Sequence, residues 1–115
     1  MAVRHPGEFE QLVLLAVARL EDWGYGVTLR RQLEERAGRR CSLGAVYATL
    51  DRLEAKGYVS SRQGEPTAER GGRAKRLFRL EPSGARVLVE ARETFDRMWD
   101  GLDDGLGLKP EGGAA

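Results

Sequence analysis

The sequence of 115 residues predicts one small, mostly helical fold with a single β-hairpin, in the order helix, helix, helix, hairpin, helix. Three observations lead to this order. Apolar residues recur at three- and four-residue spacing in the helical segments. Two short stretches, 58–63 and 75–80, are rich in β-branched and aromatic residues, and glycine or proline separates the segments. The chain length suits one compact domain with one additional element.

The composition is that of a globular protein, with 41% hydrophobic and 32% charged residues. No apolar run approaches the roughly 18 residues that cross a bilayer, and the first residues do not resemble a signal peptide. We therefore expect a cytoplasmic protein with no membrane partner. Cys41 is the only cysteine and His5 the only histidine. An internal disulfide is excluded, and neither a structural metal site nor a cofactor is expected.

The first helix is predicted over residues 8–20, which are apolar almost all round their middle and should lie between neighbouring elements. Its periodic apolar residues are Phe9, Leu12, Val13, Ala16, Val17 and Leu20. The segment DWGYG should form a turn broken by its two glycines, with Trp23 and Tyr25 as anchors. A second helix follows over residues 27–38, with Leu29, Leu33 and Ala37 on one side and Gly38 as its stop.

The third helix should begin after Ser42, a good N-cap, and end at Gly57. Helical spacing predicts a buried side made of Leu43, Val46, Leu50 and Leu53. The opposite side is dominated by small residues and comprises Gly44, Ala45, Ala48, Asp51, Arg52 and Ala55. Small residues let a helix seat closely in the DNA major groove, where Arg52 and Tyr47 would reach toward the DNA. Alanine is also simply a good helix former, so this helix alone leaves both interpretations open.

The predicted hairpin is strongly basic, with Arg62 on its first strand and five more cations from its loop into its second strand: Arg70, Arg73, Lys75, Arg76 and Arg79. Residues 41–80 hold 8 Lys/Arg against 4 Asp/Glu, a net charge of +4, whereas residues 81–115 hold 4 against 8, a net of −4. We expect the hairpin, with a flexible Gly71-Gly72 tip, to lie along a phosphate backbone. A solvated charge run is the alternative. A nucleotide-binding P-loop is excluded because no Lys-Ser/Thr follows the glycines.

Pro82 should open the last helix. Its apolar residues step by three and four and form a heptad seam of Leu88, Ala91, Phe95, Met98 and Leu102, which needs a partner. Three helices with a two-stranded wing make a winged helix-turn-helix. We therefore divide the chain into a DNA-binding domain (6–81), a dimerisation helix (82–104) and a flexible tail (105–115).

The stretches GYGVTLRRQLEERAG, SLGAVYATLDRLEAKGYVSSR and RGGRAKRLFRLEPSGARVL together resemble the PadR family of bacterial transcriptional regulators. The resemblance implies a homodimeric repressor that binds double-stranded DNA. It places Ser42, Gly44, Tyr47 and Arg52 on the DNA side of the third helix, and Arg73, Lys75 and Arg76 on the wing. The last helix would form the dimer with help from the first, which adds Phe9 and Leu12 to the seam.

The resemblance also implies that an aromatic effector can bind between subunits, near Trp99, although dimer packing is the favoured interpretation of Trp99. The sequence departs from the family at two places. Glu81 replaces the usual threonine cap of the last helix, and the wing carries Gly-Arg-Ala-Lys-Arg in place of Pro-Arg followed by aromatic residues.

An enzyme is not expected, because no serine or cysteine nucleophile has a histidine partner available. The sequence therefore favours a homodimeric repressor that binds a pseudo-palindromic operator and can respond to a ligand. The alternative is a winged-helix module that binds another protein through its apolar last helix.

Overall fold

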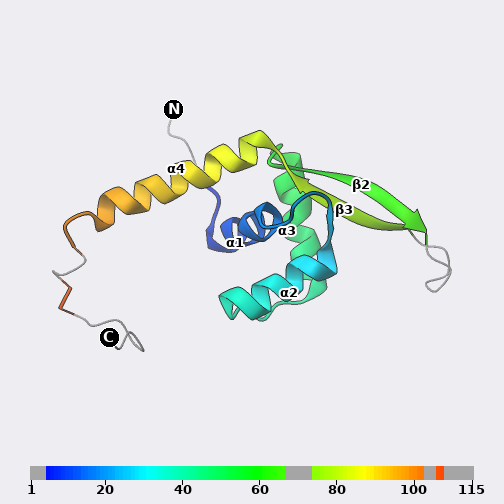
Figure 1. Ribbon diagram of the computed structural model, residues 1–115, viewed down its shortest axis with the longest axis horizontal. Helices are drawn as coiled ribbons and strands as arrows, with labels where there is room; N and C mark the ends of the chain where they lie inside the picture. Colours follow the sequence, from blue (N-terminus) through cyan, green and yellow to red (C-terminus); the bar gives the residue numbers. More distant parts are fainter. Residues whose placement is uncertain (1–4, 67–73, 103–105, 108–115) are drawn as a thin grey trace.

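The computed structural model of the chain describes residues 5–66, 74–102 and 106–107, and these residues have the predicted order of helices and hairpin (Figure 1). The elements are α1 (Glu8–Ala18), β1 (Gly24–Tyr25), α2 (Gly26–Ala37), α3 (Leu43–Ala55), β2 (Val59–Pro66), β3 (Ala74–Leu80) and α4 (Pro82–Trp99). Most of the predicted tail, and the Gly71-Gly72 tip, lie outside the described residues.

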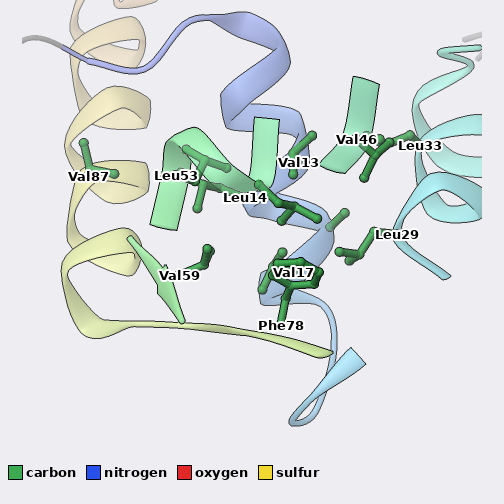
Figure 2. Close-up of a cluster of buried hydrophobic side chains, with 12 residues drawn as sticks. Val13, Leu14, Val17, Leu29, Leu33, Val46, Leu53, Val59, Phe78 and Val87 are labelled. Carbon is green, nitrogen blue, oxygen red and sulfur yellow. The ribbon is translucent and has the colours of Figure 1, made fainter. Parts of the chain in front are cut away.

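The core forms where α1, α2, α3 and the sheet meet (Figure 2). Val46, Leu50 and Leu53 of α3 are fully buried, and Phe78 of β3 is the largest fully buried side chain. Phe78 and Val17 of α1 belong to the same cluster of buried side chains (Figure 2). The predicted inner side of α3 is thus confirmed at three of its four positions.

The prediction for the fourth position, Leu43, was wrong, because 36% of this residue is exposed. Leu43 is the first residue of α3, and the buried residues of that helix begin only at Val46. Helical periodicity identifies which side of a helix is apolar, but it does not indicate how far along the helix the neighbouring elements reach.

The predicted enclosure of α1 was also wrong on one side. Val13, Leu14, Ala16 and Val17 are buried, but Leu15 remains 47% exposed. Ala37, predicted to line the inner side of α2, is exposed as well. Among the described residues, nothing covers the side of α1 that carries Leu15, so an apolar surface remains there.

The segment predicted as a simple turn contains the short strand β1, which completes a three-stranded antiparallel sheet in the order β1-β3-β2. Gly24 pairs with Phe78, and Tyr25 pairs with Leu77. Two residues are too few to show an alternating pattern, so this strand depends on the backbone partners that β3 supplies. The glycine that follows is needed for packing, because a Cβ at Gly26 would lie 2.7 Å from Cζ of Tyr47.

Both hairpin strands are longer than predicted, because β2 runs through residues 64–66 and β3 begins at Ala74, all within the expected loop of 64–74; residues 67–73 of that loop are not described. Gln63 pairs with Arg76 and Pro66 with Ala74, so the register shifts between these two pairs. Gly64 lies in this irregular stretch, where a Cβ would come within 3.1 Å of the carbonyl oxygen of Lys75. Glycine therefore lets the two strands stay close across the irregularity.

The predicted start of α3 and the glycines predicted to end α2 and α3 are confirmed, whereas α1 ends at Ala18 rather than at Leu20, and α4 ends at Trp99, short of the predicted 104. The Ser42 hydroxyl accepts a hydrogen bond of 3.0 Å from the Ala45 amide and so caps α3. Gly38 and Gly57, which follow α2 and α3, have φ angles of 62° and 82°, in the left-handed region that glycine adopts without strain. Pro82 is the first residue of α4, and Glu81 before it makes no side-chain capping bond.

The start of α4 is fixed tightly to the connection between α3 and β2. The Glu81 amide donates to the Tyr58 carbonyl at 2.9 Å, and the Ser83 hydroxyl donates to the Gly57 carbonyl at 2.6 Å. A Cβ at Gly84 would lie 2.3 Å from the Tyr58 carbonyl oxygen, so only glycine permits this approach. The joint sets the direction of α4, whose C-terminal half extends away from the other elements (Figure 1).

Replacing Leu50 by alanine should lower the free energy of unfolding by about 2 to 5 kcal/mol, because it leaves a cavity in the core. The matched control is Leu43→Ala on the same helix, which should cost about 1 kcal/mol or less because Leu43 is already exposed. Urea denaturation at one fixed protein concentration measures both. Equal losses for the two variants would contradict the burial described above.

Candidate nucleic-acid interface

The outer face of α3 is exposed, as predicted. It consists of Gly44, Ala45, Ala48, Asp51, Arg52 and Ala55, all of which are accessible to solvent. Four of these six residues are glycine or alanine, so the helix backbone lies close to the molecular surface. The inner face is held by the core, and the outer face is therefore presented on a rigid support. Such a surface can approach a flat or grooved partner closely.

Tyr47 lies at the edge between the core and this outer face. Its ring is half-buried, packs near Phe78 with centroids 6.0 Å apart, and covers the start of α2 at Gly26. The sequence predicted Tyr47 as a residue that reaches toward DNA. The structure shows that much of its ring also serves as packing.

Arg52 is the one cation on the outer face of α3, and it bends back toward α1. Its Nε lies 3.4 Å from Oε2 of Glu10, and its Nη2 donates to the Thr49 hydroxyl at 3.0 Å. Lys56, the C-cap of α3, donates to both oxygens of Glu10, at 3.1 and 3.3 Å. We call Glu10, Arg52 and Lys56 the Glu10 cluster. It joins the first turn of α1 to the last turn of α3, and sequence reasoning missed it because Glu10 is far from α3 in the chain.

Arg76 on the wing is held by two carboxylates of α3. Its guanidinium donates to Asp51 at 2.8 Å and to Glu54 at 2.9 Å, and the Ser61 hydroxyl also bonds to Glu54 at 2.6 Å. Arg76 therefore holds β3 against α3 in this structure. Two other cations predicted to bind DNA from the wing, Arg70 and Arg73, lie outside the described residues.

A second group of cations covers the opposite face of the sheet. Alternation along β3 turns Lys75 and Arg79 away from the side that carries Phe78. The guanidinium carbons of Arg62 and Arg79 lie 4.7 and 4.6 Å from the centre of the Trp23 ring, and Lys75 Nζ lies 5.3 Å from that of Tyr25. The predicted anchors of the turn are thus platforms for basic side chains.

The α4 seam divides into a buried part and an exposed part. Ala91 is fully buried within the chain and Leu88 is half-buried, so this end packs on the core. The exposed end comprises Phe95, Met98, Trp99 and Leu102, with exposed fractions of 60%, 73%, 48% and 45%. The two residues of α1 that were predicted to join the dimer interface, Phe9 and Leu12, are half-buried against the core.

Residues 14–90 match the Transcriptional regulator PadR-like family. This chain belongs to that family. The match includes α2, α3, the wing and the first half of α4, which are the elements described above. Because the family consists of transcriptional regulators, the expectation that the chain is not an enzyme is confirmed.

Individual relatives agree with the family. The Transcriptional regulator Rv3488 of Mycobacterium tuberculosis is 38% identical over 74 residues, which are 64% of this chain and 64% of that protein. A PadR family transcription regulator from Clostridium difficile shares the fold with a TM-score of 0.68 and 19% identity, over 87% of this chain and 99% of that one. Bacillus subtilis PadR in complex with operator DNA gives a TM-score of 0.61 and 17% identity, over 71% and 46%. The predicted winged helix-turn-helix is confirmed.

This PadR-like chain also carries an apolar groove between its N-terminal segment, α1 and α4. The groove has a volume of about 440 Å³. It is lined by His5, Pro6, Glu8, Gln11, Leu12, Leu15 and Phe95. It lies where the exposed side of α1 meets the exposed end of the α4 seam.

Two classes of site are absent from the described parts of this PadR-like chain. Within residues 5–66, 74–102 and 106–107, no three His, Cys, Asp or Glu side chains gather where they could bind a metal ion. None of the helices in those ranges combines the length and apolar character needed to cross a membrane. Cys41 is a free thiol that packs, half-buried, against the edge of the core.

The environment of Glu10 shifts its titration. Burial alone would raise the pKa of Glu10, but the hydrogen bonds and charge of Lys56, with help from Arg52 and the Gly7 backbone, outweigh burial. They hold the pKa below its ordinary value of 4.5. A carboxyl group whose pKa is lower in the folded than in the unfolded protein stabilises the fold above its unfolded pKa. That contribution is lost as the pH falls through the folded pKa.

Replacing Glu10 by glutamine should therefore reduce the free energy of unfolding by about 1 kcal/mol at neutral pH. The difference from the wild type should persist down to pH 4.5 and shrink below it. Urea denaturation across this pH range measures the effect, with Glu8→Gln on the same helix as the control for an exposed carboxylate. A difference that stayed constant below pH 4.5 would show that Glu10 does not act through its charge.

Proposed function

We propose that the chain is a homodimeric repressor that binds a pseudo-palindromic operator in double-stranded DNA and acts in the cytoplasm. In this proposal residues 6–81 bind DNA, the helix of residues 82–104 forms the dimer, and residues 105–115 are a tail. The observation that supports the proposal best is the outer face of α3, which is exposed, made largely of small residues and held rigidly from behind. The structure of Bacillus subtilis PadR in complex with operator DNA also supports it.

On DNA, α3 of each subunit would enter the major groove, and the two half-sites would lie about one helical turn (~34 Å) apart. Gly44, Ala45 and Ala48 would approach the floor of the groove most closely. The Ser42 end of the helix would face the DNA backbone. The ring of Tyr47 is fixed by packing, so only its hydroxyl would remain for DNA, as a hydrogen bond to the DNA backbone. Arg52 would supply the polar reach from this face.

On the wing we assign different tasks to neighbouring cations. Lys75 faces away from the helices, and with Arg70 and Arg73 it would steer and clamp the phosphates. Arg76 would reach phosphate only by leaving Asp51 and Glu54, so its main contribution is to hold the wing against α3.

The dimer would form through the exposed end of the α4 seam. Phe95, Met98 and Trp99 are all exposed, and contiguous apolar surface of this kind marks an interaction site. Leu88 and Ala91 would instead support the helix from within its own subunit. The apolar groove beside Phe95 is a suitable place for a flat aromatic effector, whose binding would make the repressor ligand-responsive.

The proposal is tested by fluorescence anisotropy on the duplex upstream of the protein's own gene and on a scrambled duplex, at two salt concentrations. Preference for the upstream duplex that persists at the higher salt supports a specific regulator. Equal, steeply salt-dependent binding to both duplexes would show only electrostatic attraction. A tight dimer that binds neither duplex would favour the alternative, a protein-interaction module that uses the exposed end of α4.

Replacing Arg73 and Lys75 by alanine should weaken binding to both duplexes by similar factors, because bonds to phosphate carry no sequence information. The slope of log affinity against log salt should fall by about one unit for each phosphate that is no longer neutralised. Arg76→Ala is the comparison: it should weaken binding to the upstream duplex with little change in slope. An unchanged slope in the Arg73/Lys75 variant would remove the wing from phosphate binding.

Replacing Phe95 and Met98 by glutamate should produce monomers that bind the operator much more weakly, since two half-sites are then no longer linked. The matched control is Val89→Glu, which places a charge on an exposed position of α4 outside the seam. Analytical ultracentrifugation reports the oligomeric state of each variant. A dimer that survived the double substitution would show that the interface lies elsewhere.

A further inference from the structure

We infer that Glu10 competes with DNA for Arg52, and that Lys56 keeps Glu10 paired when Arg52 leaves. Glu10 is then a residue that tunes operator affinity without contacting DNA. This inference rests on the proposed function, because it requires Arg52 to reach the operator. It assigns a role to a cluster that links α1 to α3.

The competition follows from the position of Arg52. Its guanidinium is the one positive group on the outer face of α3, and its side chain is 56% exposed, so DNA can reach it. In the free protein the same guanidinium is drawn back toward α1 by Glu10. The distance of 3.4 Å is long for a charged hydrogen bond, and the other bond that holds the guanidinium, to the Thr49 hydroxyl at 3.0 Å, has a neutral acceptor. A phosphate or a base can replace both bonds, because neither is a short bond between opposite charges.

Lys56 lowers the free-energy cost of releasing Arg52 from Glu10. The Glu10 side chain is only 14% exposed, and an ionised carboxylate in such a place is costly when it has no partner. Lys56 donates to both of its oxygens at 3.1 and 3.3 Å, which are shorter distances than that to Arg52. When Arg52 swings out, Glu10 therefore stays paired, and the cost of an orphaned charge is avoided.

Arg76 provides the contrast within the same helix surface. It is bound by two carboxylates, Asp51 and Glu54, at 2.8 and 2.9 Å, and its side chain is 33% exposed. Removing it would break two short charged hydrogen bonds together. Of the two arginines beside α3, Arg52 is thus the releasable one and Arg76 the fixed one.

The test is a set of dissociation constants for the full-length protein on the duplex upstream of its own gene, at one salt concentration. Glu10→Gln keeps an acceptor oxygen but removes the charge, so it should tighten binding by roughly two- to fivefold. The same change should have no effect when Arg52 is already alanine. Lys56→Ala should weaken binding by a similar factor in the wild type, and should have no effect when Glu10 is already glutamine.

Two controls isolate the effect. Glu8→Gln removes the same charge from the same turn of α1, where the carboxylate pairs with Arg39, and should leave affinity unchanged. Circular dichroism melts show whether each variant is folded. If Glu10→Gln does not fold, Glu10→Asp serves in its place, because the shorter side chain retains the charge but increases the distance to Arg52, and it should also tighten binding.

Each remaining outcome counts against the inference. Equal tightening by Glu10→Gln with and without Arg52 would mean that Glu10 acts only through its charge on the DNA. Equal weakening by Lys56→Ala with and without Glu10 would mean that Lys56 binds phosphate directly. Unchanged affinity in Arg52→Ala would make the cluster purely structural. If the wild type bound no duplex at all, the proposed function itself would fail, which is a result distinct from these three.

Discussion

The burial of the inner face of α3 is the interaction on which the rest of the structure depends. Val46, Leu50 and Leu53 are completely removed from solvent, and Phe78 closes the core from the sheet. At about 25 cal/mol for each Å² of apolar surface, this packing outweighs any of the exposed ion pairs described here. Because one face of α3 is fixed so firmly, its opposite face is presented at the surface in a single orientation. A rigid helix that must fit a groove needs that support.

Ion pairs and hydrogen bonds then hold α1 and the wing against α3. Glu10 joins it to α1 through Lys56 and Arg52, and Arg76 joins it to the wing through Asp51 and Glu54. Basic residues in a protein of this family are easily counted together as DNA-binding residues. The distances separate them: a side chain held by two carboxylates shapes the surface, whereas one with a single long ion pair remains available to a partner.

The joint between α3, β2 and α4 fixes how the proposed DNA-binding surface and the proposed dimer surface lie relative to each other. Backbone bonds at Tyr58 and the close approach of Gly84 fix the direction in which α4 leaves the domain. The exposed end of the seam therefore has a defined position relative to the outer face of α3. In a homodimer, that geometry would determine how far apart the two recognition helices lie, and hence which half-site spacing is accepted.

The sequence by itself determined the order of the elements, the inner side of α3 from Val46 onward, and the ends of the helices at Gly38, Ser42 and Pro82. These features depend on periodicity and on local backbone preferences, which neighbouring residues carry. Only the tertiary structure decided that Leu43 is exposed, that Tyr25 joins a strand, and that Arg52 meets Glu10. Each of these depends on which segment from elsewhere in the chain lies opposite the residue. A local sequence pattern does not indicate which segment that is.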